Sequence, residues 1–194
     1  MPDIKALCVY CGSSGAVAAP YREAASELGA RLASAGIEVV FGGGRVGLMG
    51  LLADAALAGG GRVTGIIPAR LRDAELAHQG VSELVIVSSM HERKRMMAER
   101  GDAFAVLPGG IGTLDETFEM LSWKQLGLHD KPIYLVDIDG YWATLRTLLD
   151  DIVERGFASA KTRRLLEVVP TIAALMTALA EAPPETPGGR PEPF

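Results

Sequence analysis

Short, almost continuous apolar runs alternate along this chain with longer segments in which apolar residues recur every three or four positions. The first pattern is typical of strands buried on both faces, and the second of amphipathic helices. The alternation predicts an α/β protein, namely a single Rossmann-like domain whose parallel sheet is flanked by helices on both faces. Strands are predicted at residues 6–10, 38–41, 62–67, 84–87, 103–107 and 133–136, and helices at residues 21–35, 48–58, 91–100, 113–126, 141–155 and 171–180.

The length of 194 residues suits one such domain, and no internal repeat or linker divides the chain. The domain is expected to span residues 1–182. Residues 183–194 are rich in proline and glycine and are predicted to form a disordered tail.

Glycine-rich segments follow three of the predicted strands. They are Cys11-Gly-Ser-Ser14, Gly42-Gly-Gly44 and Gly109-Gly-Ile-Gly112. In an open parallel sheet, ligands bind at the carboxyl ends of the strands. The three loops are therefore expected to line one crevice, with Ser14 and Gly43 among its binding residues.

The stretch Gly42-Gly-Gly-Arg-Val-Gly47 fits the dinucleotide fingerprint GxGxxG. It follows the second strand instead of the first, and no acid that could bind a ribose follows the third strand. Arg70 could bind a 2′-phosphate, so a nicotinamide cofactor stays open as a minor alternative. Proximity to a phosphate or ribose is favoured over a plain tight turn.

The most informative segment is Leu107-Pro-Gly-Gly-Ile-Gly-Thr-Leu-Asp-Glu116. It is typical of a strand end, a glycine-rich turn and the first turn of a helix, where free N–H groups and the helix dipole favour an anion. The carboxylate of Glu116 beside such a site indicates chemistry on a nucleotide. Thr113 and Glu116 also have the spacing of a helix capping box, which is the structural alternative.

A second segment, Met90-His-Glu-Arg-Lys94, begins a predicted helix capped by Ser88 or Ser89. Cations oppose the helix dipole at this end, so a solvated basic face is one interpretation. The helix precedes the strand at 103–107, however, so its first turn should lie at the binding edge of the sheet. Met90, Met96 and Met97 are expected to pack in the core.

Composition and charge exclude several classes of function. The net charge of −5 and the pI near 5.3 argue against binding to nucleic acid or anionic membranes. Cys8 and Cys11 should point to opposite faces of a strand, so neither a disulfide nor a metal site is expected. With no signal-peptide core at residues 1–5, the cytoplasm is the expected compartment.

At these residues the chain resembles the Lonely Guy family of cytokinin riboside 5′-monophosphate phosphoribohydrolases, whose relatives have often been labelled lysine decarboxylases. Residues 108–116 match its PGGxGTxxE motif, and residues 90–94 match its MHxRK segment. Residues 11–14, 41–44 and 123–132 extend the resemblance, which runs from about residue 7 to residue 157.

The resemblance implies that Arg93 and Glu116 are catalytic and that no cofactor is needed. It also implies that Ser122, where the family commonly has Thr, and Glu75 contact the substrate. The full set of expected binding residues is Ser14, Gly43, Glu75, Arg93, Lys94, Gly109, Gly110, Ile111, Gly112, Thr113, Leu114, Asp115, Glu116 and Ser122.

The reaction implied is hydrolysis of the N-glycosidic bond of adenosine 5′-monophosphate (AMP) or its N6-substituted forms, releasing the base and ribose 5-phosphate. A homodimer is expected from the same resemblance, with Trp123 and residues 126–128 as an apolar surface patch. The N6 substituent is expected to meet Met90, Met97 and side chains of a partner subunit.

Two other classes of function stay open at this point. A non-catalytic carrier of the same fold would bind a nucleotide phosphate but would have no use for a carboxylate beside it. A pyridoxal-dependent decarboxylase would need a Schiff-base lysine. Among the five lysines, only Lys94 is expected near the site.

Overall fold

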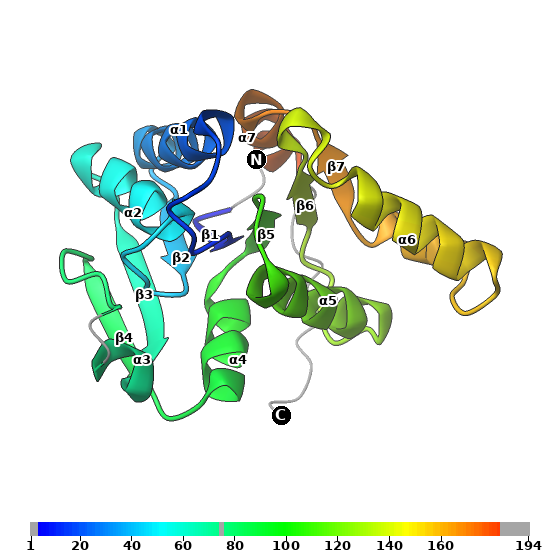
Figure 1. Cartoon of the computed structure of the whole chain (residues 1–194), viewed down its shortest axis with the longest axis horizontal. Helices are drawn as coiled ribbons and strands as arrows, with labels where there is room; N and C mark the ends of the chain where they lie inside the picture. The colour runs from blue at the N-terminus through cyan, green and yellow to red at the C-terminus, as the bar shows by residue number, and fades with distance from the viewer. Residues whose placement is uncertain (1–3, 74–75, 183–194) are drawn as a thin grey trace.

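The computed structural model describes residues 4–73 and 76–182. Glu75 and the predicted tail at residues 183–194 lie outside the described residues. Within the described part, strands and helices alternate along most of the chain, as the apolar pattern predicts (Figure 1).

The sheet has seven strands in the order β4-β3-β2-β1-β5-β6-β7, and each neighbouring pair is parallel. All six predicted strands are confirmed to within one or two residues. The seventh, β7, was missed because it has three residues and begins with the exposed Glu167. The strands are β1 (Ala6–Tyr10), β2 (Glu38–Phe41), β3 (Val63–Pro68), β4 (Glu83–Val87), β5 (Ala103–Val106), β6 (Ile133–Val136) and β7 (Glu167–Val169).

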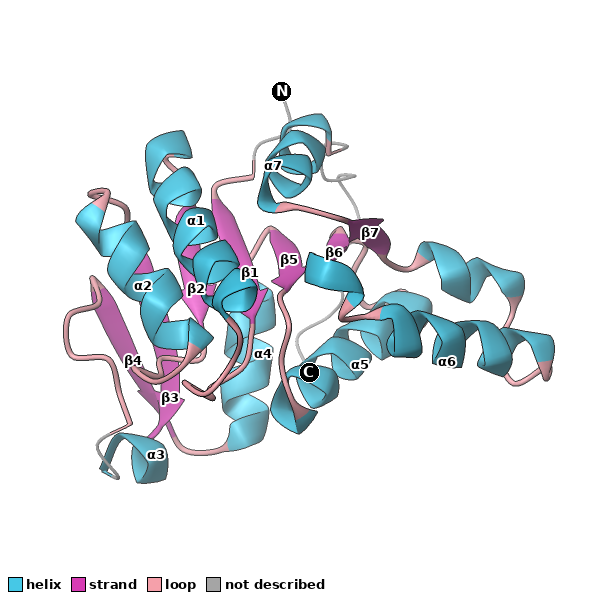
Figure 2. Ribbon diagram, turned by 45° about the horizontal axis from the view of Figure 1, so that its top comes forward, coloured by secondary structure: helices cyan, strands magenta, loops and turns pink. Residues whose placement is uncertain are grey.

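Helices cover both faces of the sheet, which confirms the predicted fold class. Buried side chains of α1, α2 and α7 form the core on one face, and those of α4, α5 and α6 form the core on the other. Figure 2 shows α1 and α2 on the opposite side of the sheet from α4. The helices are α1 (Ala19–Ala35), α2 (Leu48–Ala58), α3 (Ala69–Asp73), α4 (Met90–Arg100), α5 (Ile111–Gln125), α6 (Ala143–Glu154) and α7 (Ile172–Glu181), with 3₁₀ turns η1 (Ile138–Gly140) and η2 (Ala160–Arg164).

The two cysteines belong to different cores. Cys8 packs on the α4–α5 side of the sheet and Cys11 on the α1–α2 side, and both are free thiols. The prediction that they point to opposite faces is therefore confirmed. Burial raises the pKa of Cys8 to about 12, which makes this thiol unreactive at neutral pH.

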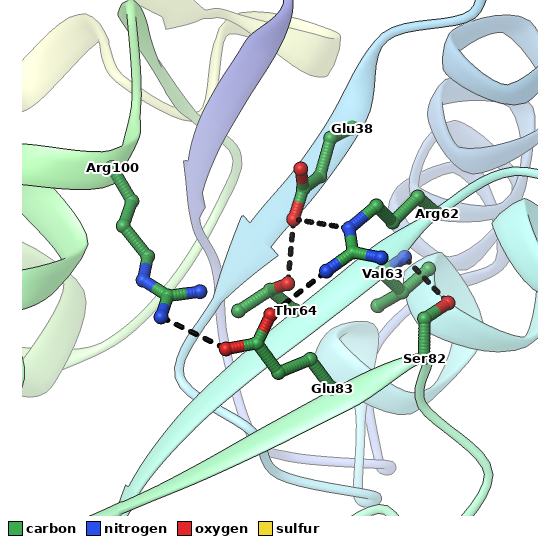
Figure 3. Close-up of polar contacts among 7 residues, drawn as sticks. All are labelled: Glu38, Arg62, Val63, Thr64, Ser82, Glu83 and Arg100. Atoms are coloured by element: carbon green, nitrogen blue, oxygen red, sulfur yellow. Dashed lines mark hydrogen bonds and ion pairs between the residues drawn. The ribbon is translucent and has the colours of Figure 1, made fainter.

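An ion-pair network joins three strands at the amino edge of the sheet (Figure 3). Glu83, the first residue of β4, accepts hydrogen bonds from Arg62 at 2.8 Å and from Arg100 at 2.9 Å. Arg62 also lies 3.4 Å from Glu38, the first residue of β2. The network fixes the edge opposite the candidate site, so it supports the sheet without taking part in ligand binding.

The strand order reverses at β1, which lies between β2 and β5. Strands β2, β3 and β4 follow one another on one side of β1. After β4 the chain passes through α4 and forms β5 on the other side of β1. The loops after β1, β2 and β5 therefore meet at a topological switch point, where open α/β sheets bind their ligands.

Candidate active site

A cavity of about 470 Å³ opens at the carboxyl ends of β1, β2, β3 and β5. One wall is polar and comes from the loops after these strands together with α4 and α5. The apolar part of the lining is built by Val46, Met49, Ile67, Leu71 and Leu76. A cavity with a few polar groups and an apolar wall is the usual form of a small-molecule site.

Arg93 is fixed in the polar wall by three separate elements. Its Nε donates to the carbonyl oxygen of Ile66 on β3 at 3.2 Å, and its Nη2 lies 3.4 Å from Oε1 of Glu116 on α5. Its guanidinium group also lies against Gly42, where an added Cβ would come within 1.8 Å of Nη2. A glycine is therefore required at position 42 for Arg93 to occupy this place.

The helix that presents Arg93 begins as the sequence predicts. Ser89 is the N-cap of α4, and its hydroxyl accepts a hydrogen bond from the backbone N–H of Glu92. The carboxylate of Glu92 in turn accepts from the backbone N–H and hydroxyl of Ser88. These bonds fix the first turn of α4, so that Arg93 faces the cavity from a defined position.

Glu116 lies in the second turn of α5, because this helix begins at Ile111 and not at Thr113. The N-cap is Gly110, and no side chain caps the helix. The structural alternative of a capping box is therefore wrong: residues 113 and 116 are inside the helix, where neither caps its first residue. The carboxylate of Glu116 is free to face Arg93 and the cavity.

Burial gives the Glu116 carboxyl unusual acid–base properties. Loss of hydration raises its pKa from the ordinary 4.5 to about 7, although the charges of Arg93 and Lys94 act in the opposite direction. The contact with Arg93 is too long to compensate fully for burial. A carboxyl with a pKa near 7 can both accept and donate a proton under physiological conditions.

The loop between β5 and α5 provides backbone donors at the mouth of the cavity. The first turn of α5 leaves the N–H groups of Ile111, Gly112 and Thr113 without intrahelical partners, and all three residues line the cavity. Gly109 is packed against Thr113 so closely that an added Cβ would lie 2.1 Å from the threonine Oγ1. The glycines thus allow close approach of the backbone, as an anion-binding turn requires.

Lys94 lies beside this cavity but does not line it. Its ammonium group is 3.1 Å from Asp115 and 3.2 Å from Glu119, both on α5. Burial by itself would lower the pKa of Lys94, but the hydrogen bonds to the two acids outweigh it and the pKa is raised. Lys94 therefore joins the two helices that present Arg93 and Glu116.

The other expected binding residues fall into three groups. Gly110, Ile111, Gly112 and Thr113 line the cavity together with the expected catalytic pair. Ser14 lines a neighbouring cavity of about 280 Å³ with Arg22 and Arg45. The remaining residues do not line either cavity: Gly43, with φ of 72°, at the end of β2; Gly109; Leu114 and Asp115 on α5; and Ser122, whose hydroxyl donates to Phe118.

Sequence reasoning missed parts of the cavity that come from neighbouring positions. Ser13 lines it beside the expected Ser14, and Gly42 and Gly44 line it on either side of the expected Gly43. The cluster of glycines at positions 42–44 indicated that this loop contacts the site. Which of the three glycines line the cavity depends on the path of the loop, which the sequence does not reveal. The expectation that Met90 packs in the core is wrong, since its side chain is 42% exposed, whereas Met97 is buried there.

The histidines are placed away from the polar wall. The ring of His129 hydrogen-bonds the carbonyl oxygen of Met120 at 3.0 Å, and burial lowers its pKa to about 4. His78 pairs with Asp54 at 3.0 Å. In residues 4–73 and 76–182, no three His, Cys, Asp or Glu side chains are grouped in a way that could hold a metal ion.

Residues 49–179 match the family described as "Possible lysine decarboxylase". The site offers no lysine suited to a Schiff base, which needs a lowered pKa. The pKa of Lys94 is raised instead. Lys124 has a lowered pKa because it is buried, but it donates to a backbone carbonyl at 2.9 Å and does not line the cavity.

Solved structures with the same fold include two molybdenum cofactor proteins. The molybdenum cofactor binding protein of Rippkaea orientalis is 17% identical, with a TM-score of 0.70 over 92% of this chain and 96% of that chain. The molybdenum cofactor carrier protein of Chlamydomonas reinhardtii is 20% identical, with a TM-score of 0.70 over 92% of this chain and 97% of that chain. At these identities the similarity establishes the fold alone.

Sequence relatives are much closer. A probable cytokinin riboside 5′-monophosphate phosphoribohydrolase of Oryza sativa subsp. japonica is 46% identical over 93% of this chain and 85% of that protein. A cytokinin riboside 5′-monophosphate phosphoribohydrolase of Arabidopsis thaliana is 46% identical over 92% of this chain and 83% of that protein. With the Arg93–Glu116 pair in the cavity, these similarities show that the chain belongs to the cytokinin riboside 5′-monophosphate phosphoribohydrolase family.

Proposed function

We propose that the protein hydrolyses the N-glycosidic bond of adenosine 5′-monophosphates, including N6-substituted forms, to the free base and ribose 5-phosphate. The observation that carries the proposal is the buried Glu116, with a pKa of about 7, beside Arg93 in a cavity that also contains free backbone donors. A carrier would bind the phosphate without needing this carboxyl group. The names of the relatives support the same reaction.

The phosphate is bound by the N–H groups at the start of α5. This anchor uses binding energy at a distance from the reacting bond to position the ribose. Ser14, which was expected from the sequence to join these N–H groups, lines the neighbouring cavity. Gly43, Lys94 and Ser122 are assigned to substrate binding by family resemblance, as is Glu75, which lies outside the described residues. Gly109, Leu114 and Asp115 complete the proposed loop and helix that surround the phosphate.

The bond between C1′ and N9 breaks through an oxocarbenium-like transition state, in which positive charge develops on the ribose. The carboxylate of Glu116 stabilises this charge and accepts a proton from the attacking water. The bonding electrons leave with the base, which takes up a proton from the solvent as it departs. Glu116 returns the proton of the attacking water to the solvent, so that no net proton is consumed. The guanidinium of Arg93 donates to purine or phosphate acceptors and stabilises the negative charge.

The apolar wall is suited to the N6 substituent of the base. Met49, Leu71 and Leu76 are apolar side chains that line the cavity. Met90 and Met97, which were expected to make this contact, do not line the cavity. Apolar burial there favours a prenyl group over an unsubstituted amine by about 1–3 kcal/mol.

The protein is further proposed to act as a homodimer in the cytoplasm. Figures 1 and 2 both show α6 projecting beyond the end of the sheet, and only Leu145 is buried among its residues. Leu148 is 47% exposed and Phe157 is 86% exposed. Leu126, in the patch expected from the sequence, is 73% exposed. Contact with a second copy would cover these side chains.

None of the helices in the described ranges is long and apolar enough to span a membrane. The dimer is tested by light scattering, which should give twice the chain mass of 20.5 kDa. The substitution Leu148→Asp introduces a charge at the proposed contact and should shift the protein toward the monomer. A monomeric wild type at micromolar concentration would refute the dimer.

Incubation with AMP tests the reaction directly. Free adenine and ribose 5-phosphate should accumulate. Adenosine, which lacks the phosphate anchor, should show both a lower kcat and a higher KM than AMP. Binding of AMP without base release would instead identify a carrier. Comparable turnover of adenosine would refute the phosphate-binding role of the loop.

A further inference from the structure

The loop between β5 and α5 is held from outside the cavity by a tyrosine that follows β6. The hydroxyl group of Tyr141 donates a hydrogen bond of 2.6 Å to the carbonyl oxygen of Gly109. Tyr141 itself does not line the cavity. We propose that Tyr141 is a positioning residue that orients the peptide between Gly109 and Gly110 for phosphate binding. The inference rests on the phosphate-binding role proposed for this loop.

Peptide geometry links the tyrosine to the cavity. In a trans peptide the carbonyl and the N–H point in opposite directions, and no cis peptide occurs among the described residues. Because the Gly109 carbonyl points to Tyr141, the N–H of Gly110 points away from it. Gly110 lines the cavity. The hydrogen bond thus directs a backbone donor away from the tyrosine and toward the proposed phosphate.

Two consecutive glycines make this peptide easy to rotate, since neither has a Cβ that restricts its dihedral angles. The preceding residue is fixed separately: the carbonyl oxygen of Pro108 accepts from the N–H of Gly12 at 3.1 Å. The following helix is fixed by its own hydrogen bonds. The peptide between the two glycines is therefore the flexible point of the loop, and the Tyr141 hydroxyl selects one of its orientations.

The ring of Tyr141 is held by contacts with two other aromatic rings. It makes edge contacts with Tyr21 on α1, with 5.5 Å between ring centroids, and with Trp142 at 4.7 Å. Trp142 is buried, and its backbone N–H donates to Asp137 at 2.7 Å. Replacing Tyr141 by phenylalanine should preserve these ring contacts and remove only the hydroxyl group.

The matched control is Tyr134, whose hydroxyl group donates to the carbonyl oxygen of Ala178 at 3.2 Å on α7. Tyr141→Phe and Tyr134→Phe each remove one hydrogen bond to a backbone carbonyl. Only the first should weaken binding of ribose 5-phosphate and raise KM for AMP, by about 3- to 10-fold, the range for one hydrogen bond. Turnover of adenosine, which has no phosphate, should stay unchanged in both variants.

Two readouts separate this inference from the proposed reaction. Amide NMR spectra of the free protein should show shifts at Gly110 and Ile111 in Tyr141→Phe but not in Tyr134→Phe. Calorimetry with ribose 5-phosphate measures the affinity without any turnover. If the wild type binds ribose 5-phosphate but releases no adenine from AMP, the proposed reaction is refuted. The ratio of the affinities of Tyr141→Phe and the wild type for ribose 5-phosphate still decides the role of Tyr141. Equal affinities, equal amide shifts or absence of wild-type binding would overturn the inference.

Discussion

Replacing Glu116 by glutamine removes a carboxyl group in the cavity whose pKa is raised by burial. The amide is close in shape to the carboxyl group but has no charge and cannot accept the proton of water. Base release from AMP should fall by about 10²- to 10⁴-fold, the usual contribution of a general base, while AMP affinity changes little. In the wild type, kcat/KM should rise with pH and level off above about 7, as the carboxyl ionises.

The same substitution should change the pH dependence of stability. In the folded protein the pKa of Glu116 is about 7, against an ordinary value of 4.5. Because the folded pKa is raised, the protonated form is favoured by folding. This contribution is fully present below 4.5 and is lost as pH rises through about 7. The difference between these values corresponds to about 3 kcal/mol.

Urea unfolding of the wild type and Glu116→Gln from pH 5 to pH 8 measures this effect. The free energy of unfolding of the variant, relative to the wild type, should increase by about 2–3 kcal/mol across the range. Glu99→Gln is the matched control, since Glu99 is 57% exposed on α4 and should give no such trend. Parallel stability curves for Glu116→Gln and the wild type would refute the buried-carboxyl argument, and wild-type turnover in the variant would refute the catalytic role.

Three further predictions concern Gly42 and Met49 in the cavity and Lys131 at the carboxyl end of α4. In Gly42→Ala the new methyl group would occupy the position of the Arg93 guanidinium, so AMP hydrolysis should fall at least tenfold; unchanged kcat/KM would mean that Arg93 is not needed in this position. Lys131→Met removes an ammonium group that donates to three carbonyl oxygens at the end of α4, and should lower the free energy of unfolding by about 1–3 kcal/mol in urea titrations; Lys161→Met in η2 should have no effect, and an equal loss in both would contradict the capping role. Isopentenyladenosine monophosphate should be favoured over AMP by roughly tenfold in kcat/KM, and Met49→Ala should reduce that preference; equal rates on AMP, GMP and CMP would instead indicate a general nucleotide nucleosidase.

Within the described ranges, the sequence by itself determined six of the seven strands, all the α-helices except the short α3, and the edge of the sheet at which the site lies. Six strands could be predicted because both faces of a parallel sheet are covered, so each buried strand has an apolar run. The motif around Arg93 and the motif ending at Glu116 could be assigned to the same edge, since each belongs to the amino end of a helix next to β5. Local patterns of this kind depend on neighbouring residues and are visible without the fold.

The tertiary structure decided where α5 begins and which glycines contact the site. Thr113 and Glu116 have capping-box spacing, but the backbone turns into the helix at Ile111 and Glu116 moves into a buried second turn. The raised pKa of Glu116 follows from that burial, which no local pattern reveals.

Long-range contacts also set the surroundings of the catalytic pair. Gly42 faces Arg93 across 51 positions of sequence, and Tyr141 reaches Gly109 across 32. These pairs meet only because β2, β5 and β6 end at one edge of the sheet. Contact between distant residues depends on strand order, and strand order is set by the packing of the whole chain.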